Sequence, residues 1–148
     1  AEYNLRLAAK LRDADFAVYC PNESEPINDK TRTDVTGRLI YQVDIGELEA
    51  SNVLLQVSED SGSNWEAGYM DALTRYHPTG HYYGVMGLAT DIRLQSIPTP
   101  AQSGVDNQAG YLNQLIVGGL QESLGIFVHE DQAIAALIAL RTEVGAEP

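Results

Sequence analysis

Apolar residues follow two different spacings along the chain, one typical of helices and one typical of strands. The pattern predicts helices over residues 1–14, 37–50, 63–76, 110–124 and 130–141. Short apolar runs predict strands over residues 16–20, 53–57, 81–86 and 125–128. Residues 53–57 (VLLQV) are nearly all apolar, as expected for a strand that is covered on both faces. Polar loops are expected over residues 22–33 and 87–108.

The alternation of predicted strands and helices favours a parallel sheet, because parallel strands are usually joined by helical crossovers. We therefore expect an α/β fold with a doubly wound, flavodoxin-like parallel sheet and helices on both faces. Such a domain normally begins with a strand, whereas this chain begins with a helical pattern, so we expect the first strand to be absent from it. No internal repeat or linker is visible, and residues 1–148 are interpreted as a single domain.

Composition narrows the range of partners. The formal net charge of -12 argues against binding to the phosphate backbone of a nucleic acid and against anionic membrane surfaces. No apolar run reaches the roughly 20 residues of a membrane span. Cys20 is the one cysteine, which excludes an internal disulfide and suits a reducing compartment, so a cytoplasmic location is expected.

An acidic turn offers the clearest candidate chemistry. Residues 60–69 (DSGSNWEAGY) follow the apolar run 53–57 and precede a helical pattern, which places Asp60 and Glu66 at the carboxyl end of a strand. Ligands bind at this edge of open α/β sheets. Two carboxylates there can divide a displacement at a sugar carbon between a nucleophile and a proton donor. With the helix starting near Ser63, Glu66 lies in its first turn, where the helix dipole favours the ionised nucleophile and leaves Asp60 as the acid.

Structural roles are open for most of these residues. Ser63 and Glu66 also fit a capping box, in which the glutamate binds back to the serine amide. Asp44 is equally compatible with a solvated helix position, and Asn113 with a simple helix start. Trp65 and Tyr69 are interpreted as packing residues. His77 and His81 are separated by Pro78 and Gly80, so we expect no metal site from them.

Four segments together resemble the nucleoside 2-deoxyribosyltransferase family. Residues 60–69 are similar to that family's acidic glycine motif, and residues 40–44 (IYQVD) resemble its aspartate-bearing helix before the central strand. Residues 90–93 (TDIR) resemble a loop of some members, and residues 111–115 (YLNQL) resemble the start of a later helix. The segments occur in the family's order and span most of the chain.

The resemblance implies a transfer of 2-deoxyribose between purine or pyrimidine bases, with small deoxynucleosides and free nucleobases as substrates and no cofactor or metal. It implies that Glu66 is the nucleophile at C1′ and that Asp60 and Asp44 contact the base. Gly62 and Ser63 would belong to the substrate site. Family members assemble sites from two chains, so a homo-oligomer is expected in which Asn113 reaches a neighbouring subunit's site. The family's opening strand, with its aromatic residue, has no counterpart in this sequence.

Two other functions stay open. On the same scaffold, water could resolve the sugar ester, which would make the protein a nucleoside or nucleotide N-glycosidase. A flavodoxin-like fold is also compatible with a non-catalytic nucleotide-binding domain.

Overall fold

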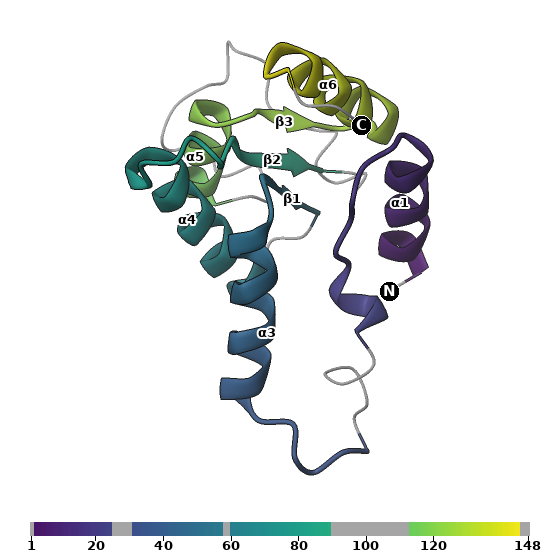
Figure 1. Ribbon diagram of the computed structural model, residues 1–148, viewed down its shortest axis with the longest axis vertical. Coiled ribbons are helices and arrows are strands. Elements are labelled where there is room, and N and C mark those ends of the chain that lie inside the picture. The colour runs from purple at the N-terminus through teal and green to yellow at the C-terminus, as the bar shows by residue number, and fades with distance from the viewer. Residues whose placement is uncertain (1, 25–30, 58–59, 90–112, 146–148) are drawn as a thin grey trace. The chain divides into compact units, whose positions relative to one another are not determined.

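The computed structural model describes residues 2–24, 31–57, 60–89 and 113–145 (Figure 1). The chain divides into two compact units, one formed by residues 1–50 and 134–148 and the other by residues 51–133. We describe each unit by itself. The acidic turn belongs to the second unit, and Asp44 belongs to the first.

The second unit contains a three-stranded parallel sheet with the strand order β1-β2-β3. The strands are β1 (Val53–Gln56), β2 (Gly84–Leu88) and β3 (Ile126–Phe127), drawn as arrows in Figure 1. Val53 lies opposite Gly84 in the first pair, and Gly87 lies opposite Ile126 in the second. Because β2 has a neighbour on each side, it is the central strand, and all five of its residues are buried.

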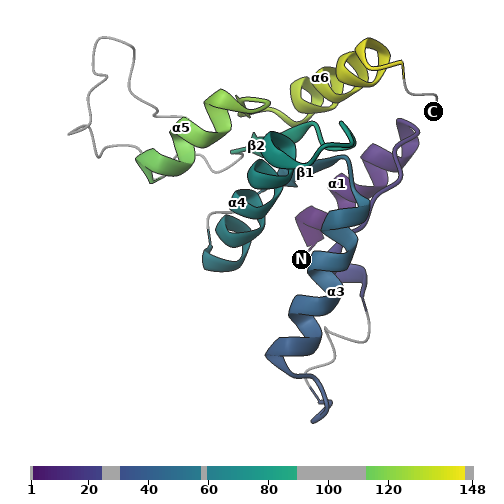
Figure 2. The same ribbon diagram turned by 60° about the vertical axis from the view of Figure 1, so that its left-hand side comes forward.

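Two crossover helices flank these strands. Helix α4 (Ser61–Tyr76) connects β1 to β2, and α5 (Gln114–Glu122) precedes β3 (Figure 2). Helix α4 contacts β1 and β2, while α5 contacts β2 and β3. Met70 of α4 and Met86 of β2 are fully buried, so both elements contribute to the apolar core.

Two glycines in β2 allow neighbouring residues to pack closely against its backbone. Gly84 has a φ of +126°, and a Cβ atom there would lie 2.3 Å from the Ser123 hydroxyl, which accepts a hydrogen bond from the Val85 amide. A Cβ at Gly87 would lie 2.8 Å from a methyl group of Leu120. The central strand therefore needs small residues where α5 and the following turn approach its backbone.

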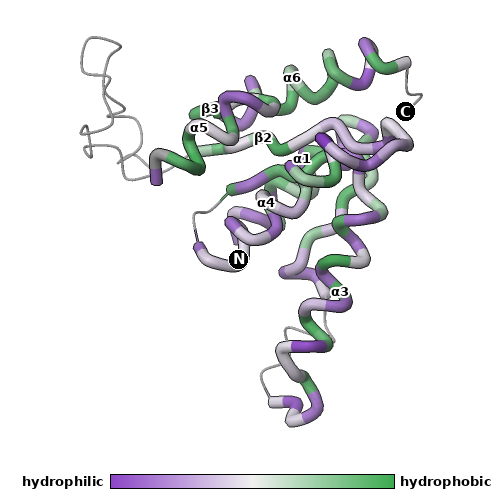
Figure 3. Tube along the Cα trace, turned by 90° about the vertical axis from the view of Figure 1, so that its left-hand side faces the viewer, coloured by the Kyte–Doolittle hydropathy of each residue, from purple (hydrophilic) through white to green (hydrophobic). Residues whose placement is uncertain are grey.

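The first unit contains α1 (Glu2–Asp13), the 3-10 helix η1 (Pro21–Glu23) and α3 (Gly37–Ala50). Helix α6 (Glu130–Glu143) starts in the second unit and continues into the first. Along α3, polar and apolar residues alternate in bands, as the colours of Figure 3 show. Arg12 at the end of α1 forms two hydrogen bonds to the Glu23 carboxylate, at 2.8 and 2.6 Å, and so ties α1 to η1.

Most predicted elements are present, and the α/β class with a parallel sheet flanked by helices is confirmed. The helix predicted over residues 37–50 has these boundaries in the structure. The helices predicted over residues 1–14, 110–124 and 130–141 correspond to α1, α5 and α6 with shifted ends. The strand predicted over residues 81–86 runs from Gly84 to Leu88.

The strand predicted over residues 16–20 is wrong. Those residues lie in an irregular segment between α1 and η1. An apolar run becomes a strand only when a neighbouring strand supplies the ladder hydrogen bonds, and no described residue pairs with this run. The predicted loop 87–108 begins too early, since Gly87 and Leu88 belong to β2. Its residues 90–108 lie outside the described residues. Residues 25–30 of the predicted loop 22–33 lie outside them as well.

Candidate functional site

The acidic turn lies where the sequence placed it, between the end of β1 and the start of α4. Asp60 is the N-cap of α4, and its Oδ1 accepts a hydrogen bond from the Ser63 amide at 2.9 Å. The Ser63 hydroxyl donates to Oδ2 of the same carboxylate at 3.0 Å. The predicted Ser63–Glu66 capping box is therefore wrong, because Asp60 takes the cap position and Ser63 lies three residues into the motif.

This earlier helix start changes the environment of Glu66. Since α4 begins at Ser61, Glu66 lies in the second turn, and the first turn contains no acidic residue. The expectation that Glu66 occupies the first turn is wrong, and the helix dipole acts on it only weakly, since that field falls off within one turn. The Glu66 side chain is half-buried. Its local environment is therefore set by packing more than by the helix terminus.

A part-buried hydrogen bond ties the start of α4 to the sheet. Gln56, the last residue of β1, is 7% exposed, and its amide nitrogen donates to Oδ1 of Asn64 at 2.8 Å. Asn64 lies in the first turns of α4, so this bond ties the start of the helix to the end of the strand. A buried polar group needs such a partner, because leaving it unpaired costs about 1–3 kcal/mol. Neither residue is predicted as part of the site from the sequence, although a glutamine within an apolar run is a visible signal.

Gly62 leaves space for the Asp60 carboxylate that caps α4. A Cβ atom at this position would lie 3.2 Å from Oδ1 of Asp60, closer than most side chains allow. Gly62 and Ser63 therefore lie directly against the Asp60 carboxylate. Four of the six predicted site residues, Glu66 included, lie at Asp60 or in the first two turns of α4.

Asp44 lies on α3 in the first unit and is half-buried. The Tyr19 hydroxyl donates to its Oδ1 at 3.0 Å. Burial, and then this hydrogen bond to a carboxylate, raise the pKa of Tyr19 to about 12. Tyr19 therefore stays a proton donor at neutral pH and orients the Asp44 carboxylate. Sequence reasoning missed Tyr19, because the two residues are 25 positions apart.

Asn113 is the N-cap of α5, and its side chain accepts a hydrogen bond from the Leu115 amide at 2.9 Å. The interpretation of Asn113 as a helix start is confirmed. Its role in a neighbouring subunit's site stays a prediction. The other segments that carry the resemblance, residues 90–93 and 111–112, lie outside the described residues.

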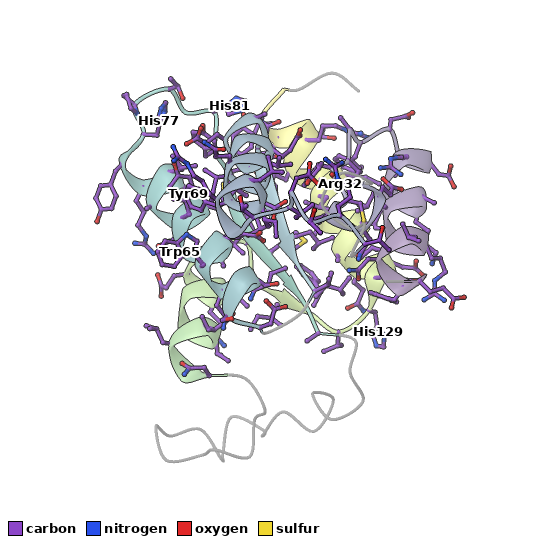
Figure 4. The ribbon with its side chains drawn as sticks, turned by 90° about the horizontal axis from the view of Figure 1, so that it is seen from below. Arg32, Trp65, Tyr69, His77, His81 and His129 are labelled. Atoms are coloured by element: carbon purple, nitrogen blue, oxygen red, sulfur yellow. The ribbon has the colours of Figure 1, made fainter. Side chains whose placement is uncertain are left out.

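The aromatic residues of the motif differ from expectation. Trp65 is 66% exposed, so its interpretation as a packing residue is wrong, while Tyr69 is half-buried (Figure 4). Among the described residues no group of three or more histidine, cysteine or carboxylate side chains could hold a metal ion. His77 and His81 instead each lie edge-on to Tyr82, with ring centroids 5.2 and 4.9 Å apart. No helix in the described part of the chain is long and apolar enough to cross a membrane.

The comparisons with known proteins support the fold. The chain is similar to the crystal structure of a conserved protein from Enterococcus faecalis V583, with a TM-score of 0.68 and 23% sequence identity. The match covers 94% of this chain and 89% of that chain. The parallel sheet and its helices are consistent with a flavodoxin-like α/β fold. No family model and no curated protein matches the sequence.

Proposed function

We propose that this protein transfers a 2-deoxyribosyl group between nucleobases, through a covalent ester between C1′ of the sugar and Glu66. The observation that carries the proposal is the turn itself. Asp60 caps α4 after the carboxyl end of β1, next to the central strand of a parallel sheet, and Glu66 lies in the second turn of the same helix. This edge is the usual ligand site of open α/β sheets. The resemblance of residues 60–69 to the deoxyribosyltransferase motif supplies the reaction type.

In the first step a carboxylate oxygen of Glu66 attacks C1′, and the C1′–N bond breaks. The base leaves with the electron pair of that bond and takes up a proton. In the second step a nitrogen of another base attacks C1′ from the vacated side, releases the Glu66 carboxylate and gives up its own proton. Two inversions retain the configuration at C1′.

We assign the handling of this proton to Asp60. Its Oδ2 faces the Ser63 hydroxyl, and a hydroxyl can donate to an ionised carboxylate or accept from a protonated one. The pair therefore keeps its hydrogen bond in both protonation states of Asp60. The assignment of Asp44 to the base rests on the resemblance alone, and Tyr19 donates to one oxygen of this carboxylate.

The test is base exchange. The protein is incubated with a deoxynucleoside and a different free base, and chromatography is used to look for the new deoxynucleoside. We expect exchange, and we expect Glu66→Gln to lower its rate about a thousand-fold or more, because the variant retains the shape and loses the nucleophile. Glu143→Gln, at an exposed glutamate at the end of α6, is the matched control and should exchange like the parent.

The products separate the alternatives. Free base and deoxyribose without transfer, even at high acceptor concentration, would make the protein an N-glycosidase. Nucleoside binding without turnover, unchanged by Glu66→Gln, would make it a binding domain. A deoxyribosyl adduct on the Glu66 peptide, detected by mass spectrometry, is the result that the covalent mechanism requires.

A further inference from the structure

Trp65 is the one tryptophan of the chain, and its side chain is 66% exposed in the second turn of α4 (Figure 4). A single exposed apolar residue is common on protein surfaces and needs no explanation by itself. Trp65 is distinguished by its position, because it directly precedes Glu66 in the segment that follows the carboxyl end of β1. It therefore places a large flat side chain beside the proposed nucleophile.

Three groups of the acidic turn are neighbours of Gly62. This glycine lies three residues before Trp65 and four before Glu66, and residues with these separations are adjacent on a helix surface. Long side chains also lean toward the start of their helix, over the residues three and four positions earlier. A Cβ atom at Gly62 would lie 3.2 Å from Oδ1 of Asp60. Two carboxylates and an aromatic ring thus surround one exposed residue that has no side chain.

We propose that Trp65 binds the nucleobase by stacking against its flat face, with a preference for purines. The inference rests on the proposed function and adds the residue that holds the base. Aromatic side chains stack on bases of every kind, because each base has a π face. A purine has two fused rings, as indole has, so it covers more of the indole than a pyrimidine does. Because apolar stabilisation grows with the area that is covered, the larger base should bind more tightly.

Stacking leaves the reacting atoms of the base free. The indole contacts only the face of the base, so the edge that carries C1′ and takes up a proton stays available to Glu66 and Asp60. The same stack forms in the bound substrate and in the transition state. An interaction of this kind strengthens binding and leaves the rate of the chemical step nearly unchanged. Trp65 is therefore expected to act on KM and on the choice of base.

Fluorescence measures the stack directly, since the chain has no second tryptophan. A free base without nucleoside binds and cannot turn over. We expect adenine to quench the Trp65 emission to saturation, with half-maximal quenching at an about 5-fold lower concentration than cytosine. Deoxyribose has no ring to stack and should leave the emission unchanged. Calorimetry on the same samples measures binding without reference to the indole.

The titration has two results that would overturn the role of Trp65. In one, adenine binds in the calorimeter without quenching the emission, which would place the base elsewhere. In the other, adenine does not bind at all. Equal affinities for adenine and cytosine would overturn the preference for purines.

Base exchange by two variants and a control measures the contribution of the indole. Trp65→Ala should raise the KM for the acceptor base at least about 10-fold with kcat nearly unchanged, and Trp65→Phe, which keeps an aromatic face, should restore most of the affinity. Tyr76→Ala removes an 82% exposed aromatic residue from the other end of α4 and should leave this KM unchanged. Circular dichroism should show all three variants folded, because both side chains are exposed.

Failure of this inference is distinguishable from failure of the proposed function. Base exchange in which Trp65→Ala keeps the parent KM would leave the reaction in place and overturn the role of Trp65. Saturable quenching by adenine in a protein that catalyses no exchange would overturn the reaction and support Trp65 as a base-binding residue.

Discussion

Substitution of Asp60 separates its structural role from its proposed chemical one. Asp60 caps α4 through the Ser63 amide at 2.9 Å and also accepts from the Ser63 hydroxyl. Loss of an N-cap side chain costs about 0.5–2 kcal/mol, whereas serine caps almost as well as aspartate. We therefore expect Asp60→Ala to lower the free energy of unfolding by about 1 kcal/mol and Asp60→Ser to change it by less than about 0.5 kcal/mol.

Thermal unfolding followed by circular dichroism measures this difference. One kcal/mol corresponds to a shift of about 2–4 °C in Tm for a chain of this size. Asp60→Ala should therefore melt about 2–4 °C below the parent, with Asp60→Ser close to the parent. If Asp60→Ala melts at the parent temperature, the observed cap contributes nothing and the reasoning is refuted.

The same pair of variants tests the chemistry. Both lack the carboxylate, so both should lose base exchange if Asp60 handles the proton of the base. An Asp60→Ser variant that exchanges at the parent rate would reduce Asp60 to a helix cap. The comparison is informative because this variant keeps the fold of the turn while it removes the acid.

Three further predictions concern the fold around the site. Gly84→Ala should lower the free energy of unfolding by about 2–5 kcal/mol, because it adds backbone strain and a clash with the Ser123 hydroxyl. Gly80 also has a positive φ but has open space around it, so Gly80→Ala should lower the free energy of unfolding by only about 1 kcal/mol, as measured by urea unfolding. Tyr19 has a folded pKa of about 12, above its usual value of 10.0, so the stability it contributes is complete below pH 10 and is lost as the pH rises toward 12. In a spectrophotometric titration, Tyr19→Phe should remove that late-ionising tyrosine. Arg12 lowers the pKa of Glu23 below 4.5, so the stabilisation by this ion pair is present above pH 4.5 and is lost as the pH falls further. The Tm of Arg12→Gln should therefore fall less than that of the parent when the pH is lowered below 4.5.

The sequence alone predicted the class of fold because that information is local. The helical spacing of apolar residues fixed α3 to the residue, and the apolar run 53–57 marked β1. The alternation of strands and helices then led to the parallel sheet that the structure contains. The acidic turn was placed correctly for the same reason, since a polar segment between a strand and a helix is visible in the order of residues.

Other features of the structure depend on contacts between residues that are far apart in the sequence. Residues 16–20 have the composition of a strand, but strand formation needs a neighbour, and the described residues supply none. Asp60 and Ser63 were both good capping residues, and the structure selects Asp60, with the start of α4 tied to β1 through Gln56 and Asn64. As a result, Glu66 lies in the second turn of α4, and not in the first turn as predicted.

The sequence by itself therefore determined most of the helices and strands and the position of the acidic segment that follows β1. Only the tertiary structure decided which acid caps the helix, that Tyr19 binds Asp44, and that Trp65 faces outward. Periodicity shows that a helix has an apolar face, but coverage of that face depends on residues far away in the chain. Hydrogen bonds between distant side chains are likewise set by packing and not by spacing in the sequence.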